Sequence, residues 1–326
     1  NEAMLLDAHQ RRHRYLRIAV TEQCNFRCTY CRPLGSVQTM SAAMMRTEEI
    51  LRFAALCATQ GVRKIRLTGG EPLLRPGIAP LVAALRALPG VDTVALTTNG
   101  MLLRRHTSAL REAGLDAVNV SLDSLQPERF RAITGCDALA EVLRGIDAAL
   151  EAGIGTVKIN TVVMRGVNED ELEDFVALTR AAPLEVRFIE YMPFDDNAWR
   201  SDRMMSAAEM RTALAARFAL RPLPGGDAVA KRFAVEGHRG TVGIIASMTE
   251  HFCQSCERLR LTADGAVKVC LFSPGELNVR DLMRAGADDA ALLEALRIAL
   301  LGKWAAHPGP DALRQLHNRS MIRIGG

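Results

Sequence analysis

The chain has no apolar run of membrane-spanning length, and no apolar stretch near its first residue is long enough for a secretory signal. It also lacks a concentrated basic stripe. Its 41 Lys and Arg against 37 Asp and Glu give a net charge of only +4, which does not suit a dedicated nucleic-acid binder. No repeat or low-complexity segment is present. These absences predict a cytoplasmic globular protein that binds neither nucleic acid nor membrane. The length of 326 residues suits one large or two modest domains.

Cysteine is the residue type whose distribution is most informative. Six of the eight cysteines form two triplets, one near each end of the chain. In a reducing compartment, such clusters indicate metal or redox chemistry rather than disulfides. Cys57 lies in an apolar helical pattern and is predicted to be a core thiol, and Cys136 is assigned no role. The triplets are Cys24, Cys28 and Cys31, and Cys253, Cys256 and Cys270.

Strand-like segments alternate with amphipathic segments along the first two thirds of the chain. This alternation predicts an α/β fold in which right-handed crossovers join six parallel strands into a barrel or partial barrel. The predicted strands are 15–21, 64–70, 93–100, 117–123, 156–163 and 184–192, and the predicted helices include Thr47–Gln60, Ile78–Leu88, Leu139–Ala152 and Glu169–Ala181.

The predicted strands alternate between apolar and polar residues, whereas strands buried on both faces are continuously apolar. A period of two places each set on one face, so the polar face lines either a ligand-filled lumen or solvent. Crossover helices usually cover parallel sheets, and we therefore favour a lumen that serves as a substrate chamber. The polar set is Arg17, Thr21, Arg66, Thr68, Thr97, Asn99, Asn119, Ser121, Asp123, Lys158 and Asn160.

The strand and helix alternation breaks at RPLPGG, residues 221–226, which is typical of a linker or turn. A hairpin is predicted further on, around Asp264–Gly265. We therefore predict a barrel domain over residues 1–221 and a smaller α+β domain over residues 222–326.

The first triplet has C-x3-C-x2-C spacing in a loop directly after the first strand, and no fourth ligand stands nearby. Zinc sites usually close with four ligands. Three thiolates instead suit a cubane iron–sulfur cluster with one open iron that can chelate a small molecule. A zinc site completed by a distant histidine is the alternative.

Other polar groups follow the predicted strands. The sequence LTGGEP, with Gly70 and Glu71, ends the second strand, and NVSLD, with Ser121 and Asp123, ends the fourth. Paired glycines allow close backbone approach to a ligand, and a glutamate can accept hydrogen bonds from an ammonium group. The carboxyl ends of barrel strands form the usual active-site face.

The second triplet, CQSC followed by Cys270, suits either zinc, with His251 as a further ligand, or another cluster. The spacing leaves both open.

These motifs together resemble the radical S-adenosylmethionine (SAM) superfamily. Within it, the chain is similar to the GTP 3′,8-cyclases of molybdenum-cofactor biosynthesis (the MoaA family) from about Arg17 to Gly326. The segments that carry the resemblance are RIAVTEQCNFRCTYC, IRLTGGEPLLR, LTTNG, VNVSLD, VKIN, EVRFIEYM, CQSCERLRLTADGAVKVCLF and the terminal IRIGG.

The resemblance implies a partial (β/α)6 TIM-like barrel with a C-terminal domain that carries a second cluster. It implies a lyase that uses two 4Fe–4S clusters and SAM. A deoxyadenosyl radical takes hydrogen from C3′ of GTP, and C3′–C8 bond formation gives 3′,8-cyclo-7,8-dihydro-GTP.

The resemblance also implies roles for particular residues. Both cysteine triplets would hold clusters. SAM contacts would come from Tyr30, Gly70, Glu71, Ser121 and Met192, and GTP contacts from Arg17, Arg66, Thr97, Lys158, Arg258 and Arg260. Arg17, Arg258, Arg260, Gly325 and Gly326 would act in catalysis, and Arg187 would lie in the chamber.

The implied partners are GTP, an electron donor of the flavodoxin or ferredoxin type, and cyclic pyranopterin monophosphate synthase as the next pathway enzyme. A homodimer is compatible with the sequence. Two rival interpretations stay open at this point: a peptide-modifying radical SAM enzyme with an auxiliary cluster, and a non-catalytic metal-binding or redox-sensing module.

Overall fold

A computed structural model describes residues 4–32, 44–195, 197–224, 229–250 and 252–325. Within them, one twelve-stranded sheet has the order β12-β11-β10-β1-β2-β3-β4-β5-β6-β9-β8-β7. Strands β1 to β6 pair in parallel and in chain order, which confirms the predicted α/β fold of six parallel strands. They are β1 Tyr15–Ala19, β2 Lys64–Thr68, β3 Thr93–Thr98, β4 Ala117–Ser121, β5 Thr156–Val163 and β6 Glu185–Glu190.

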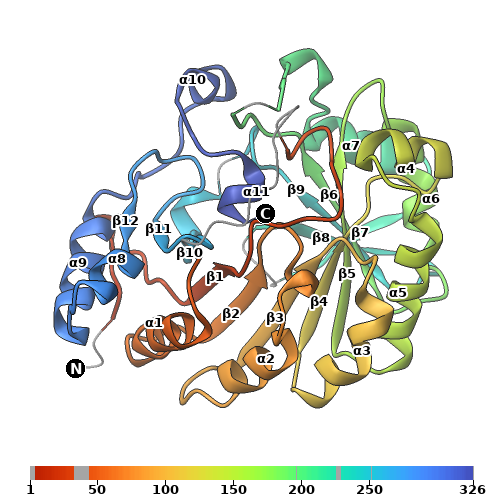
Figure 1. Ribbon diagram of the computed structural model, residues 1–326. Helices are drawn as coiled ribbons and strands as arrows, with labels where there is room; N and C mark the ends of the chain where they lie inside the picture. The colour runs from red at the N-terminus through yellow and green to blue at the C-terminus, as the bar shows by residue number, and fades with distance from the viewer. Residues whose placement is uncertain (1–3, 33–43, 196, 225–228, 251, 326) are drawn as a thin grey trace.

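Helices follow these strands on the outer side of the curved sheet, as Figure 1 shows for α1, α2, α3 and α5. They are α1 Thr47–Thr59, α2 Ile78–Arg86, α3 Leu103–Glu112, α4 Pro127–Thr134, α5 Leu139–Glu151 and α6 Leu172–Ala177. The predicted helix over Glu169–Ala181 extends too far at its C-terminal end, because α6 ends at Ala177. The chain turns after Ala177, where the Thr179 hydroxyl donates to the carbonyl of Val176 at 2.8 Å.

The alternation of apolar and polar residues that was predicted along the strands is present in the structure. On the outer face, the apolar residues are completely buried between strands and helices, and they include Leu16, Ile18, Ile65, Leu67, Val94, Leu96, Val118, Val120 and Ile159. The opposite face carries polar side chains from neighbouring strands, and several of them line one cavity. The favoured interpretation of the polar face as a ligand chamber therefore agrees with the structure.

The last third of the chain extends the sheet at both edges. Strand β9 pairs in parallel with β6, and β10 pairs in parallel with β1. The predicted hairpin is confirmed, because β10 and β11 are antiparallel around Asp264–Gly265. The division at residue 221 stays a prediction. The added elements are α7 Ala207–Ala215, β7 Leu220–Pro222, β8 Lys231–Val235, β9 Thr241–Ile245, β10 Arg258–Leu261, β11 Ala266–Lys268, β12 Leu277–Asn278, α8 Val279–Arg284, α9 Asp289–Leu301, α10 Pro310–Gln315 and α11 Met321–Ile324.

A buried polar cluster anchors the segment before β1. Asp7 accepts a hydrogen bond from Arg11 Nε at 2.6 Å and lies 3.2 Å from His13 Nε2. Burial and the charge of Lys303 lower the pKa of His13 to about 4. The imidazole is therefore neutral in the folded chain at neutral pH.

Because the folded chain keeps His13 neutral, we expect its free energy of unfolding to decrease in acid. An unfolded histidine titrates near pH 6.5, so between about pH 6.5 and pH 4 the unfolded chain binds a proton that the folded chain does not. The free energy of unfolding should fall as the pH falls through this window, by up to ~3 kcal/mol from this group. Urea unfolding at about pH 7.5 and about pH 5 should show a smaller pH effect in His13→Gln. The exposed His317→Gln is the control, and equal pH effects in His13→Gln and wild type would contradict the prediction.

Candidate active site

The inner face of the sheet and the C-terminal segments enclose a cavity. Its lining includes Tyr15, Arg17, Arg66, Asn119, Asn160, Arg187, Met192, Cys253, Cys256, Arg258, Arg260, Cys270, Met321 and Gly325. The fold thus brings Arg17 and Arg66 of the predicted polar face together with the second cysteine triplet, although these residues are far apart in the sequence.

Three arginines form a row across the sheet in this cavity. Arg17 on β1 is in register with Arg260 on β10 and with Arg66 on β2, and neighbouring strands are only about 4.8 Å apart. Burial, together with the charges of Arg258 and Arg17, lowers the pKa of Arg260 to about 9. Like charges so close repel each other, and a bound polyanion would relieve that repulsion.

Several buried polar atoms of the cavity have no hydrogen-bond partner within the described residues. They are the Nε atoms of Arg17, Arg258 and Arg260 and the Oδ1 atoms of Asn119 and Asn160. Buried polar atoms are rarely left unsatisfied. The site therefore suits a ligand that offers both hydrogen-bond acceptors, as phosphates do, and donors, as sugar hydroxyls or base N–H groups do.

Thr97 on β3 lies next to the row, and Lys158 lies two strands further along the sheet on β5; neither is among the residues that line the cavity in the described part of the chain. Arg66 donates to Thr97 Oγ1 at 3.3 Å and to the carbonyl of Leu96 at 2.9 Å. Lys158 forms a 3.5 Å ion pair with Glu185. Thr97 thus orients Arg66, and direct contact of either residue with substrate stays a prediction.

The first triplet lies in the loop between β1 and α1, at the carboxyl end of the sheet. The Tyr30 hydroxyl donates to Asp123 Oδ2 at 2.6 Å and ties this loop to the end of β4. The amides of Gly70 and Glu71 donate to the carbonyls of Thr21 and Gln23 at 2.8 and 2.6 Å and tie it to the end of β2. The loop is therefore fixed from two strand ends.

Burial disfavours the thiolate forms of the first triplet. Burial, with the nearby Cys24, raises the pKa of Cys31 to about 12, and burial raises that of Cys24 to about 11. Bound metal is what would convert all three to thiolates. Within the described residues, no three His, Cys, Asp or Glu side chains converge on one metal ion. A cubane binds each of its thiolates at a different iron.

Gly70 and Glu71 make close contacts within the protein, and the predicted contact of Gly70 with SAM stays a prediction. A Cβ at Gly70 would lie 2.1 Å from the carbonyl oxygen of Gln23, so only glycine permits this approach of the cysteine loop. Glu71 is fully buried and accepts from Leu73 N, Thr98 Oγ1 and Asn99 N at 2.9, 2.7 and 2.7 Å. Burial raises its pKa to about 7. Its contact with SAM stays a prediction, as do those of Tyr30, Ser121 and Met192.

The second triplet is held by two buried cations that the sequence did not reveal. Arg11 donates to the carbonyl of Cys253 at 2.7 Å. Lys303 Nζ lies 3.6 Å from Cys256 Sγ and donates to the carbonyl of Arg258 at 3.1 Å. Burial alone would raise the pKa of Cys256, but Arg258, Lys303 and Arg260 lower it to about 6. This setting favours a metal-ligating thiolate. His251 lies outside the described residues.

Asn119 and Asn160 line the cavity, as the predicted polar face implied, and so does Tyr15, which was not predicted as a site residue. The period-two pattern could have identified Tyr15, which precedes Arg17 by two positions on β1. Its hydroxyl accepts from Arg66 Nε at 2.6 Å. Gly325 lines the cavity, its role in catalysis stays a prediction, and Gly326 lies outside the described residues.

Comparison with known proteins first defines the class. Residues 18–179 match the Radical SAM superfamily, and residues 184–308 match the family described as Molybdenum Cofactor Synthesis C. The fold is similar to that of Streptococcus suis SuiB bound to S-adenosylmethionine, with a TM-score of 0.62, 15% identity, and coverage of 87% of this chain and 68% of that one. At this identity the likeness concerns the fold alone.

The particular family is defined by closer relatives. The chain is 44% identical to the GTP 3′,8-cyclase of Heliobacterium modesticaldum over 99% of this chain and 100% of the relative. It is 47% identical to the mitochondrial GTP 3′,8-cyclase of Arabidopsis thaliana over 99% of this chain and 84% of the relative. The chain therefore belongs to the GTP 3′,8-cyclase family, as the motifs indicated.

The chain spans about half the length of some curated relatives. Molybdenum cofactor biosynthesis protein 1 of Mus musculus is 50% identical over 99% of this chain but only 51% of its own length. No helix among the described residues is long and apolar enough to cross a membrane. The expected cytoplasmic location stays a prediction, since the Arabidopsis relative is named as mitochondrial.

Proposed function

We propose that this chain is a radical SAM GTP 3′,8-cyclase that converts GTP to (8S)-3′,8-cyclo-7,8-dihydroguanosine 5′-triphosphate in molybdenum cofactor biosynthesis. The observation that carries the proposal is the row of Arg260, Arg17 and Arg66 in the cavity that also contains the second cysteine triplet. A triphosphate is the ligand class that such a row suits, because each guanidinium offers a fork of donors to phosphate oxygens.

In this proposal Cys24, Cys28 and Cys31 hold the cluster that the superfamily implies. When bound, that cluster and SAM supply the 5′-deoxyadenosyl radical that removes the hydrogen from C3′ of GTP. The role of the chain's own residues is to bind these groups and to orient them. Tyr30 and Gly70 fix the cysteine loop against the ends of β4 and β2. The buried Glu71 joins the ends of β2 and β3.

Cys253, Cys256 and Cys270 would hold a second 4Fe–4S cluster at the cavity that the arginines also line. Arg17, Arg66, Arg258 and Arg260 hold the triphosphate, so that C3′ is directed toward the SAM side and C8 can bond to it. Binding in this cavity would fix the relative positions of the reacting atoms. An electron donor of the flavodoxin or ferredoxin type and a downstream cyclic pyranopterin monophosphate synthase complete the proposed partners.

The direct test is anaerobic turnover. The chain, reconstituted with iron and sulfide, is given SAM, a strong reductant and GTP, and products are followed by mass spectrometry. We expect GTP-dependent 5′-deoxyadenosine together with a product isomeric with GTP. Deoxyadenosine without a GTP product would contradict the assigned substrate.

Replacing Cys253 by serine distinguishes the roles of the two cysteine triplets. We expect Cys253→Ser to keep part of its SAM cleavage and to lose GTP cyclisation, because only the second triplet changes. The control is Cys136→Ser, a partly buried cysteine of neither triplet, which should cyclise GTP as wild type does. Unchanged cyclisation in Cys253→Ser would contradict the role of the second triplet.

A further inference from the structure

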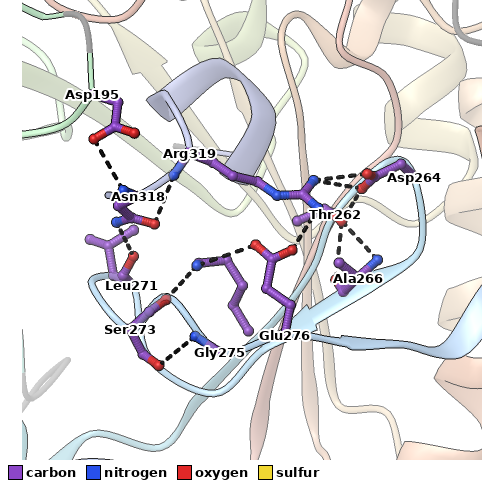
Figure 2. A network of polar contacts seen from close by, with 11 residues as sticks. Asp195, Thr262, Asp264, Ala266, Leu271, Ser273, Gly275, Glu276, Asn318 and Arg319 are labelled. Carbon is purple, nitrogen blue, oxygen red and sulfur yellow. Dashed lines mark hydrogen bonds and ion pairs between the residues drawn. The ribbon is translucent and has the colours of Figure 1, made fainter. Parts of the chain in front are cut away.

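The C-terminal tail is tied to the β10–β12 region by one arginine. Figure 2 shows Arg319 between two carboxylates. Its Nη1 donates to both oxygens of Asp264, at 2.9 and 2.8 Å, and its Nη2 donates to Glu276 Oε2 at 2.5 Å. Asp264 lies in the turn between β10 and β11, and Glu276 directly precedes β12. A guanidinium fork that bonds to two carboxylates fixes both position and orientation.

Asn318, the preceding residue, adds two further ties. Its backbone amide donates to Asp195 Oδ1 at 3.0 Å, and its Nδ2 donates to the carbonyl of Leu271 at 3.0 Å. Asp195 belongs to the segment after β6, and Leu271 directly follows Cys270 of the second triplet. Two consecutive residues of the tail thus join three separate segments around the cavity, as Figure 2 also shows.

The acceptors of Arg319 are themselves held in place. The Thr262 hydroxyl donates to Asp264 Oδ1 at 2.5 Å. The buried Lys268 donates to the carbonyl of Ser273 at 2.5 Å and lies 3.4 Å from Glu276. The two carboxylates that accept from Arg319 are therefore held in fixed positions by residues of the β10–β12 region.

The last residues of the tail, beyond Arg319, lie at the active site. Helix α11 begins at Met321, and both Met321 and Gly325 line the cavity. A Cβ at Gly325 would lie 2.9 Å from Thr68 Cγ2 and 3.0 Å from Ala19 Cβ, so the tail is in close contact with the carboxyl ends of β2 and β1. In Figure 1, α11 lies on the inner side of the sheet.

We propose that Arg319 is a positioning residue, whose bonds to Asp264 and Glu276 hold α11 and Gly325 against the cavity. It touches no reacting atom in this scheme. The expected effect of Arg319 on turnover rests on the proposed cyclase function, whereas its expected effect on the position of the tail does not.

The test compares Arg319→Met with Arg319→Lys, which keeps the charge but not the fork. Arg314→Met is the matched control, because Arg314 is an exposed arginine on α10 outside these contacts. Amide hydrogen exchange is measured on the full reconstituted chain. In Arg319→Met, the amides of Arg323 and Gly325, which bond to Ser320 and Met321, should exchange at least ~10-fold faster. Arg319→Lys should be intermediate, and Arg314→Met should match wild type. Unchanged exchange of these amides in Arg319→Met would overturn the proposal.

A second readout concerns turnover. Arg319→Met should lower the rate of cyclisation while the dissociation constant of GTP stays within about twofold of wild type, since the phosphate-binding arginines are unchanged. If the tail amides of Arg319→Met exchanged faster but cyclisation kept its wild-type rate, the positioning role would be overturned. If wild type itself produced no cyclised GTP, the proposed function would fail, and hydrogen exchange would still decide whether Arg319 holds the tail.

Discussion

Replacing Gly70 by alanine is expected to abolish SAM cleavage. A Cβ at this position would lie 2.1 Å from the carbonyl oxygen of Gln23, 2.5 Å from its carbon and 2.7 Å from the carbonyl oxygen of Glu22. These are backbone atoms of the loop that carries Cys24, so they cannot yield as a flexible side chain would. The loop must move away from the end of β2, which displaces the first cysteine triplet.

A displacement of about 1 Å in an active site can reduce the rate ~100-fold, and we expect at least that loss of deoxyadenosine formation in Gly70→Ala. Iron bound per chain should fall as well, because the first triplet no longer holds its geometry. The control is Gly309→Ala, where an added Cβ meets no atom within 4 Å. Normal SAM cleavage by Gly70→Ala would show that this close approach is not required.

Replacing Arg260 by methionine is expected to weaken GTP binding ~100-fold, because charge-assisted hydrogen bonds to a phosphate contribute up to about 3 kcal/mol. The same change should not destabilise the chain without GTP. It removes one of three neighbouring cations and the Nε atom that has no partner within the described residues. Affinity and stability should therefore respond differently to one substitution.

Calorimetric titration with GTP and urea unfolding measure the two effects on the same samples. The control is Arg111→Met, an exposed arginine on the outer helix α3, which should leave GTP affinity unchanged. Equal affinity in Arg260→Met and wild type would contradict the phosphate site. A large loss of stability without GTP would show that Arg260 supports the fold rather than the ligand.

The inner face of the sheet was predictable from the sequence because the period of a strand is local. Arg17, Arg66 and Asn160 alternate with apolar neighbours, and these apolar residues lie against the helices. The ends of five of the six strands were placed two residues too late for the same reason, whereas the end of β5 was predicted correctly. Residues such as Gly70 continue the pattern in sequence, but the chain has already turned toward the cysteine loop.

Contacts between distant segments could not be predicted in this way. Nothing local indicates that β10 pairs with β1 and so brings Arg260 beside Arg17. Arg11 and Lys303 stand alone in segments without a motif, yet both hold the second cysteine loop. Glu71 was predicted from its residue type as an acceptor for an ammonium group and from the resemblance as a SAM contact, and only the structure reveals its three protein donors.

The central claim is that this cavity orients C3′ of GTP toward a radical formed at the first cysteine triplet. The most direct test uses GTP that carries deuterium at C3′, in anaerobic turnover with unlabelled SAM. The account predicts deuterium in the 5′-deoxyadenosine, formed together with the cyclised product. Cyclised product accompanied by deoxyadenosine without deuterium would contradict it.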